Sequence, residues 1–83
     1  MASPTESEVV AAVTVIVRDE IDAKAVVQFE SDLLRDLRLD SLSLMTLVVG
    51  LEDRFQIVLS EEDSAGIRTV GELAALVLRK AAA

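Results

Sequence analysis

The chain is 83 residues long, which allows one domain with a single modest core. Its net charge of −7, from 15 acidic and 8 basic residues, disfavours binding to nucleic acid or anionic lipid and favours protein partners with a basic surface. Because the chain holds neither cysteine nor histidine, disulfides, Cys/His metal sites and a Ser-His-Asp triad are excluded. Catalysis by carboxylates alone stays possible, but nothing in the sequence points to it, so we expect a protein that is not an enzyme and has neither catalytic nor metal-binding residues.

The apolar runs and the N-terminal residues indicate no membrane span and no signal peptide. The longest apolar run of the first half covers residues 9–17, whereas a helix that crosses a bilayer needs about 20 residues. Residues 1–8 carry two acids and no base, unlike a secretory signal. We expect a cytoplasmic protein with one domain over residues 1–83, a disordered start at residues 1–4 and a loose tail at residues 81–83.

The N-terminal half predicts one helix followed by a long loop. Apolar residues recur at helical spacing and predict a helix over about residues 5–20, with the stripe Val9, Val13, Ile16 and Val17. Its candidate N-caps are Ser3, Thr5 and Ser7. In residues 22–40 charged side chains interrupt the apolar ones, which predicts a loop held on the core by a few side chains. The apolar candidates are Phe29, Leu33, Leu34 and Leu37.

Residues 41–55 have the strongest helical pattern in the chain. One apolar stripe contains Leu44, Leu47, Val48, Leu51 and Phe55. Either Asp40 or Ser41 can cap the start of this helix. Gly50 lies in its interior, where glycine costs about 1 kcal/mol relative to alanine, and is a candidate point of close packing.

The last third predicts a short helix and then a longer one. Ser60 precedes three acids and starts a helix that Gly66 ends after one or two turns. Thr69 caps the final helix, with Glu72 completing a capping box. We therefore predict an all-α protein, a small antiparallel four-helix bundle of three longer helices and one short one, with a long loop between the first two.

The tripeptide Asp40, Ser41 and Leu42 is the candidate functional site. An Asp-Ser pair before an apolar helix is in itself an ordinary cap. Here, however, it stands where a long polar loop meets a strongly amphipathic helix. The Ser41 hydroxyl would lie at the positive end of the helix dipole, whose N–H groups can receive a phosphate. Because no base lies nearby to activate the hydroxyl, an external enzyme would have to modify it.

Several blocks of residues follow one another in a distinctive order around Ser41. They are residues 33–42, 47–48, 51–57, 59–63 and 67–73. In this order they resemble the acyl carrier protein family over about residues 33–78. The resemblance implies that a phosphopantetheinyl transferase, with coenzyme A and magnesium, attaches a 4′-phosphopantetheine arm to Ser41. The arm ends in a thiol, so a free-standing carrier without cysteine would hold acyl or polyketide groups as thioesters.

The resemblance also implies contacts with partner enzymes. Asp40 matches an acid that helps the transferase to recognise the carrier, with a simple cap as the alternative. Leu42 matches an exposed apolar contact, with a core position as the alternative. The candidate partner-binding residues are Asp40, Leu42, Leu44, Met45, Glu52, Asp53, Glu61 and Glu62. The partners would be the transferase and acyl-loading, condensing or tailoring enzymes with basic or apolar docking patches, and the carrier would be a monomer.

Some positions depart from the family's pattern. Arg38 stands where the family usually has glycine, so either the loop turns differently or Arg38 accepts a strained backbone. Its charge would neutralise the arm's phosphate or simply solvate the loop. Ser43 and Thr46 replace acids that are common in fatty acid carriers, and Met45 either faces partners or packs in the core.

These departures favour a carrier of a specialised polyketide or lipopeptide pathway over a general fatty acid carrier. An aminoacyl or peptidyl carrier of nonribosomal synthesis would use the same serine and the same arm, so it stays an alternative. An unmodified helical interaction module is a further alternative, because it explains the composition and the apolar stripes equally well.

Overall fold

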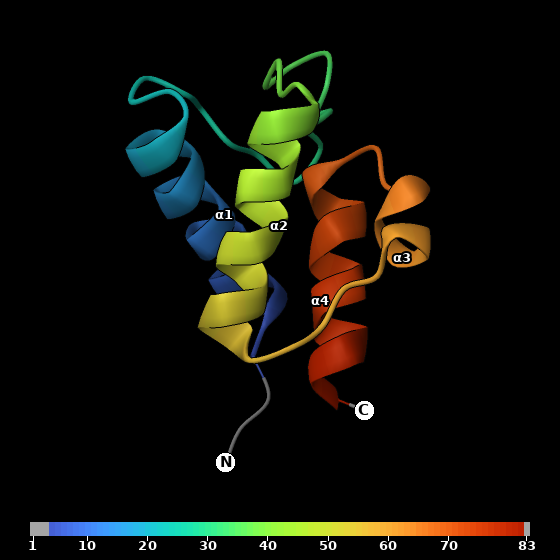
Figure 1. The fold of residues 1–83 in the computed structure, drawn as a ribbon. Helices are drawn as coiled ribbons and strands as arrows, with labels where there is room; N and C mark the ends of the chain where they lie inside the picture. The colour runs from blue at the N-terminus through green and yellow to red at the C-terminus, as the bar shows by residue number, and fades with distance from the viewer. Residues whose placement is uncertain (1–3, 83) are drawn as a thin grey trace.

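The computed structural model describes residues 4–82 and contains four helices. They are α1 (Glu6–Glu20), α2 (Ser41–Phe55), α3 (Glu61–Ala65) and α4 (Val70–Ala82). The three long helices pack on one another, and the short α3 lies beside α4 (Figure 1). The predicted all-α bundle of three long helices and one short helix is thus confirmed.

The direction of α4 differs from a simple antiparallel bundle. Figure 1 shows α2 and α4 both starting at the end of the bundle where the long loop lies, whereas α1 finishes there. The chain leaves α2 at the opposite end and returns through α3 before α4 begins. The connection that contains α3 therefore reverses the chain once more, which the helical pattern alone did not indicate.

The start of α1 is fixed by a reciprocal capping box. The Thr5 hydroxyl accepts the Glu8 N–H, and the Glu8 carboxylate accepts the Thr5 N–H, both at 3.2 Å. Of the three candidate caps the structure uses Thr5. Ser7 lies inside the helix, and Ser3, with the rest of residues 1–3, lies outside the described residues.

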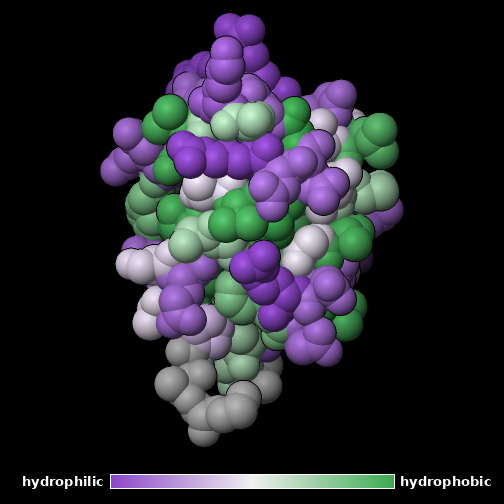
Figure 2. All heavy atoms as spheres, turned by 90° about the vertical axis from the view of Figure 1, so that its left-hand side faces the viewer, coloured by the Kyte–Doolittle hydropathy of each residue, from purple (hydrophilic) through white to green (hydrophobic). Residues whose placement is uncertain are grey.

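The core is aliphatic and comes mainly from the three long helices. Its buried members are Val9, Ala12, Val13, Ile16, Val17, Leu33, Leu39, Leu47, Leu51, Val70, Leu73, Ala74 and Val77. Gly50 permits α2 to approach α1, because a Cβ at this position would lie 2.9 Å from Cδ1 of Ile16. The expected close packing at this glycine is therefore confirmed. Figure 2 shows the face that α1 covers, where a band of apolar side chains runs between hydrophilic ones.

The long loop is fastened to the start of α4. The N–H groups of Val70 and Gly71 donate to the carbonyls of Ser31 and Phe29 at 2.9 and 2.8 Å, so the loop satisfies two N–H groups that a helix start leaves free. The Phe29 ring lies so close to Gly71 that a Cβ there would come within 2.7 Å of it. Leu33 is buried as expected, whereas Leu34 is 62% exposed and does not anchor the loop on the core.

The C-terminal end of α4 corrects one expectation. Ala81 and Ala82 belong to the helix rather than to a loose tail, and Ala83 lies outside the described residues. Residues 81–83 are all alanine, which has the highest helix propensity, so the helix continues through Ala82. Over residues 4–82, no helix is both long enough and apolar enough to cross a membrane.

Candidate functional site

Asp40 caps α2, which leaves Ser41 as the first helical residue. The Asp40 carboxylate accepts the Ser43 N–H at 2.7 Å, and its carbonyl accepts the Leu44 N–H at 2.8 Å. The N–H and then the hydroxyl of Ser43 lower the pKa of Asp40, so this carboxylate is charged at neutral pH. The cap role predicted for either Asp40 or Ser41 thus falls to Asp40.

The Ser41 side chain is exposed and takes no part in capping the helix. Its hydroxyl lies at the N-terminal end of a 15-residue helix, where the partial positive charge favours a phosphate oxygen. The residues present therefore fit a phosphate-linked group on this hydroxyl. Over residues 4–82 no cluster of acids that could hold a metal ion is found.

Arg38 keeps the loop turn that glycine would make, at the cost of strain. Its φ is 55°, in the left-handed region that disfavours long side chains by about 1–2 kcal/mol. Its neighbour Leu39 is buried, and the Leu39 N–H donates to the Leu33 carbonyl at 3.0 Å. The core and this hydrogen bond therefore hold the turn in place. Of the two alternatives for Arg38, strain is the correct one.

Asp32 stabilises the same loop through hydrogen bonds to its backbone. Its carboxylate accepts the N–H groups of Arg35 at 2.8 Å and Leu34 at 3.0 Å. The Arg35 N–H is the main cause of the lowered pKa of Asp32, which keeps this carboxylate charged. The loop that leads to Ser41 is therefore an ordered segment, anchored by Leu33, Leu39 and Asp32, rather than a loose connection.

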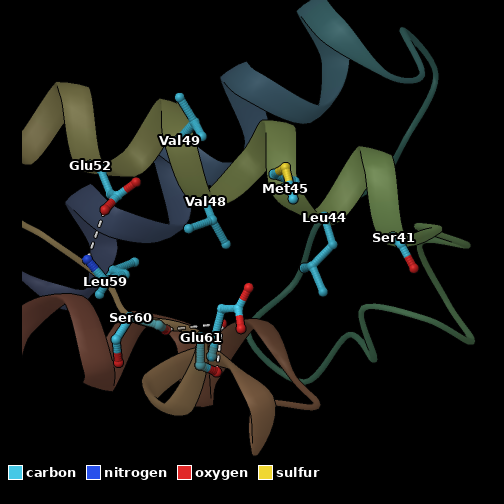
Figure 3. A pocket seen from close by; sticks show the side chains of 10 residues that line it. Ser41, Leu44, Met45, Val48, Val49, Glu52, Leu59, Ser60 and Glu61 are labelled. Carbon is cyan, nitrogen blue, oxygen red and sulfur yellow. Dashed lines mark hydrogen bonds between the residues drawn. The ribbon is translucent and has the colours of Figure 1, made fainter.

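A groove of about 310 Å³ starts beside Ser41 and runs between α2 and α3. One wall comes from α2, and Figure 3 shows Leu44 and Val48 pointing from it towards α3. The full lining is Ser41, Leu44, Met45, Val48, Val49, Glu52, Leu59, Ser60, Glu61 and Ser64. We call this the α2–α3 groove. Its α2 wall is mainly apolar, whereas the α3 wall presents hydroxyl and carboxylate groups.

The predicted partner contacts on α2 divide into exposed and packed residues. Leu42 and Met45 are 74% and 62% exposed, so neither is a core residue. Val49 is also exposed and extends this row at spacings of three and four residues. Val49 was not among the predicted contacts, although the i, i+3, i+7 spacing from Leu42 indicates it. Leu44, by contrast, is half-buried and packs against the core.

The predicted acidic contacts divide in the same way. Asp53, Glu61 and Glu62 are exposed. Glu52 is half-buried, and its carboxylate accepts the Leu59 N–H at 2.8 Å. Figure 3 shows this bond at the end of the α2–α3 groove away from Ser41. Glu52 thus holds the connection between α2 and α3.

Comparison with known proteins identifies the family. The family model for the phosphopantetheine attachment site matches residues 10–77 of this chain, which include Ser41 and both walls of the groove. The chain belongs to the acyl carrier protein family. Its prosthetic group is 4′-phosphopantetheine, and its partners include a phosphopantetheinyl transferase and biosynthetic enzymes. The family predicted from the blocks around Ser41 is thereby confirmed.

Individual relatives support the same assignment. The acyl carrier protein MbtL of Mycobacterium sp. (strain MCS) is 38% identical over 82 residues, covering 96% of this carrier and 91% of the relative. The acyl carrier protein of Kineococcus radiotolerans is 34% identical over 74 residues, covering 88% and 91%. The meromycolate extension acyl carrier protein of Mycobacterium tuberculosis is 31% identical over 74 residues, 88% of this carrier but 64% of that longer protein.

Proposed function

We propose that Ser41 carries the phosphopantetheine arm of this acyl carrier protein. The observation that supports it is an exposed serine hydroxyl at the first position of α2, free of capping duty because Asp40 caps the helix. In the modification, Ser41 Oγ bonds to the phosphorus of phosphopantetheine. The pyrophosphate P–O bond of coenzyme A breaks, the adenosine bisphosphate leaves, and the hydroxyl proton passes to a base on the transferase.

Loaded in this way, the carrier holds acyl or polyketide groups as thioesters on the arm and presents them to other enzymes, with no reaction of its own. The α2–α3 groove opens beside Ser41 and offers an apolar wall to the arm and the first atoms of its cargo. The proposal includes that the carrier is a monomer and is located in the cytoplasm.

The docking surface in this proposal combines two kinds of side chain. The exposed apolar row on α2 consists of Leu42, Met45 and Val49, and the first turn of this helix holds no acid. Acids are exposed on α3 instead, at Glu61 and Glu62. A fitting partner therefore offers an apolar depression to α2 and basic side chains to α3.

This surface supports the proposal of a specialised biosynthetic pathway, because a partner's contact with α2 would depend on apolar area rather than on charge. One of the relatives is also named for a particular process, the meromycolate extension acyl carrier protein. We therefore place this carrier with dedicated partners rather than with a general fatty acid synthase.

The test is the mass of the intact protein after modification. Apo-protein is incubated with coenzyme A, magnesium and a promiscuous phosphopantetheinyl transferase. We expect one added phosphopantetheine on the wild type and on Ser43→Ala, which removes a hydroxyl two residues away. Ser41→Ala should gain no mass. Because Ser41 is not the cap, this variant should keep its free energy of unfolding within about 0.5 kcal/mol.

Two outcomes would contradict the assignment. The first is an unchanged wild-type mass under conditions that fully modify a control carrier protein. The second is modification of Ser41→Ala to the same extent as the wild type, which would move the attachment point to another hydroxyl. A circular dichroism spectrum of each variant shows that the helices are intact before the masses are compared.

A further inference from the structure

The helix that forms the α3 wall of the groove buries little apolar surface against the core. None of the five residues of α3 is buried. Its flanking residues supply the anchors, since Leu59 before it is buried and Ile67 after it packs partly against the core. A helix of this length is not stable in isolation. The position of α3 between these two anchors must therefore come from its contacts with the other helices.

One such contact joins α3 to α4. Lys80 Nζ lies 2.9 Å from Oδ2 of Asp63, and the two side chains are 35% and 22% exposed. Among the described residues, this is the only hydrogen bond or ion pair that links a side chain of α3 to another helix. The same carboxylate also accepts the Ser60 N–H at 3.1 Å, so it completes the capping box of α3 while it binds Lys80.

The geometry of this contact bears directly on the groove. The groove is lined by Ser60, the N-cap of α3, and by Glu61 and Ser64 within this helix, whereas the Asp63 carboxylate contacts Lys80 of α4. Glu61, Asp63 and Ser64 belong to the same five-residue helix. A displacement of Asp63 from Lys80 would therefore carry the whole polar wall of the groove with it.

We propose that Lys80 is a positioning residue for the α2–α3 groove, because its contact with Asp63 holds α3 in place and so sets the width of the groove beside Ser41. The part of this inference that concerns the arm rests on the proposed function. The part that concerns α3 does not, since it can be measured on the apo-protein. The two can therefore fail separately.

The first experiment measures amide hydrogen exchange in the apo-protein by NMR. Lys80→Met keeps most of the side-chain volume and removes the charge. We expect exchange in α3 to rise by about threefold to tenfold, while α1 and α2 stay at wild-type rates. Lys80→Arg should restore the wild-type rates, because arginine also reaches and binds a carboxylate. Arg79→Met is the matched control, since Arg79 is the exposed neighbouring base in the same turn.

Three results of this exchange experiment would overturn the proposal. Wild-type exchange in α3 of Lys80→Met would mean that the ion pair does not position the helix. An equal rise in all four helices would mean that Lys80 supports the whole fold rather than the groove wall. A failure of Lys80→Arg to restore α3 would equally remove the ion pair as the cause.

The second experiment uses holo-protein loaded from isotope-labelled coenzyme A. Nuclear Overhauser contacts between the arm and the methyl groups of Val48 and Leu59 report whether the arm lies in the groove. We expect these contacts to weaken in Lys80→Met relative to Arg79→Met, because the wall opposite α2 is displaced. Strong and unchanged contacts in Lys80→Met would overturn the link between Lys80 and the groove. Failure to attach the arm at all would contradict only the proposed function.

Discussion

The two walls of the α2–α3 groove are built in different ways. The α2 wall belongs to a 15-residue helix whose Leu47 and Leu51 are fully buried in the core. The α3 wall belongs to a five-residue helix without a buried side chain, held by its flanks and by one ion pair. The attachment serine proposed here stands on the firmly anchored wall. Core packing therefore holds the α2 side of the groove, whereas the α3 side depends on an ion pair in addition to its flanking residues.

The largest expected effect tests the α2 side. Leu51→Ala removes a fully buried side chain where α2 packs against the other helices. We expect the free energy of unfolding to fall by about 2–5 kcal/mol, from lost apolar burial and the cavity left behind. The matched control is Val49→Ala on the exposed face of the same helix, which should change it by less than about 1 kcal/mol. Urea unfolding followed by circular dichroism measures both, and similar losses would refute the division between the two faces.

A smaller effect tests the loop that leads into the α2 wall. Arg38 has a left-handed backbone, so Arg38→Gly should raise the free energy of unfolding by about 1 kcal/mol. Arg38→Asn removes the same charge with a side chain that tolerates this conformation, so it should also stabilise. Arg35→Gly is the control, because Arg35 lacks the positive φ and gains nothing from glycine. Destabilisation by both Arg38 substitutions would show that contacts of Arg38 outweigh its strain.

The same contrast explains how far the sequence could predict the structure. The bounds of α2 were predictable because its apolar stripe repeats over four turns and Asp40 supplies a cap. The short α3 was predictable from Ser60 and its acids, which are local signals. The family was predictable because the blocks around Ser41 keep the order that the family has, and the proposal of Ser41 as the attachment site follows from the same blocks.

Long-range contacts were not predictable in this way. Nothing local connects Lys80 with Asp63, which is 17 residues earlier in the chain, or Glu52 with the Leu59 N–H. Glu52 was expected to face partners because a charged residue is usually exposed, and only its hydrogen bond reveals a structural role. The left-handed backbone of Gln56 at the end of α2 was likewise missed, because glycine and asparagine are the usual signals for it.

The smallest expected effect tests the electrostatic side through pH. Lys80 is the main cause that lowers the pKa of Asp63 from 3.8 to about 2, followed by the N–H and hydroxyl of Ser60. A carboxyl whose pKa is lower in the folded state stabilises the fold above its ordinary pKa. That contribution is lost as the pH falls from about 4 to about 2, where the carboxyl is protonated in the folded state as well.

Asp63→Asn isolates this contribution, because the asparagine amide oxygen can still accept the Ser60 N–H but carries no charge to form an ion pair with Lys80. The wild type should unfold at a higher temperature than Asp63→Asn at pH 6, and the difference should shrink steadily between pH 4 and pH 2. Glu62→Gln serves as the control, since Glu62 is exposed and adjacent, and its difference from the wild type should be smaller at pH 6. Comparison within pairs is necessary because the pKa values of Asp32 and Asp40 are also lowered, so the wild type itself loses stability in acid. A difference for Asp63→Asn that stays constant down to pH 2 would mean that the charge of Asp63 does not hold the α3 wall.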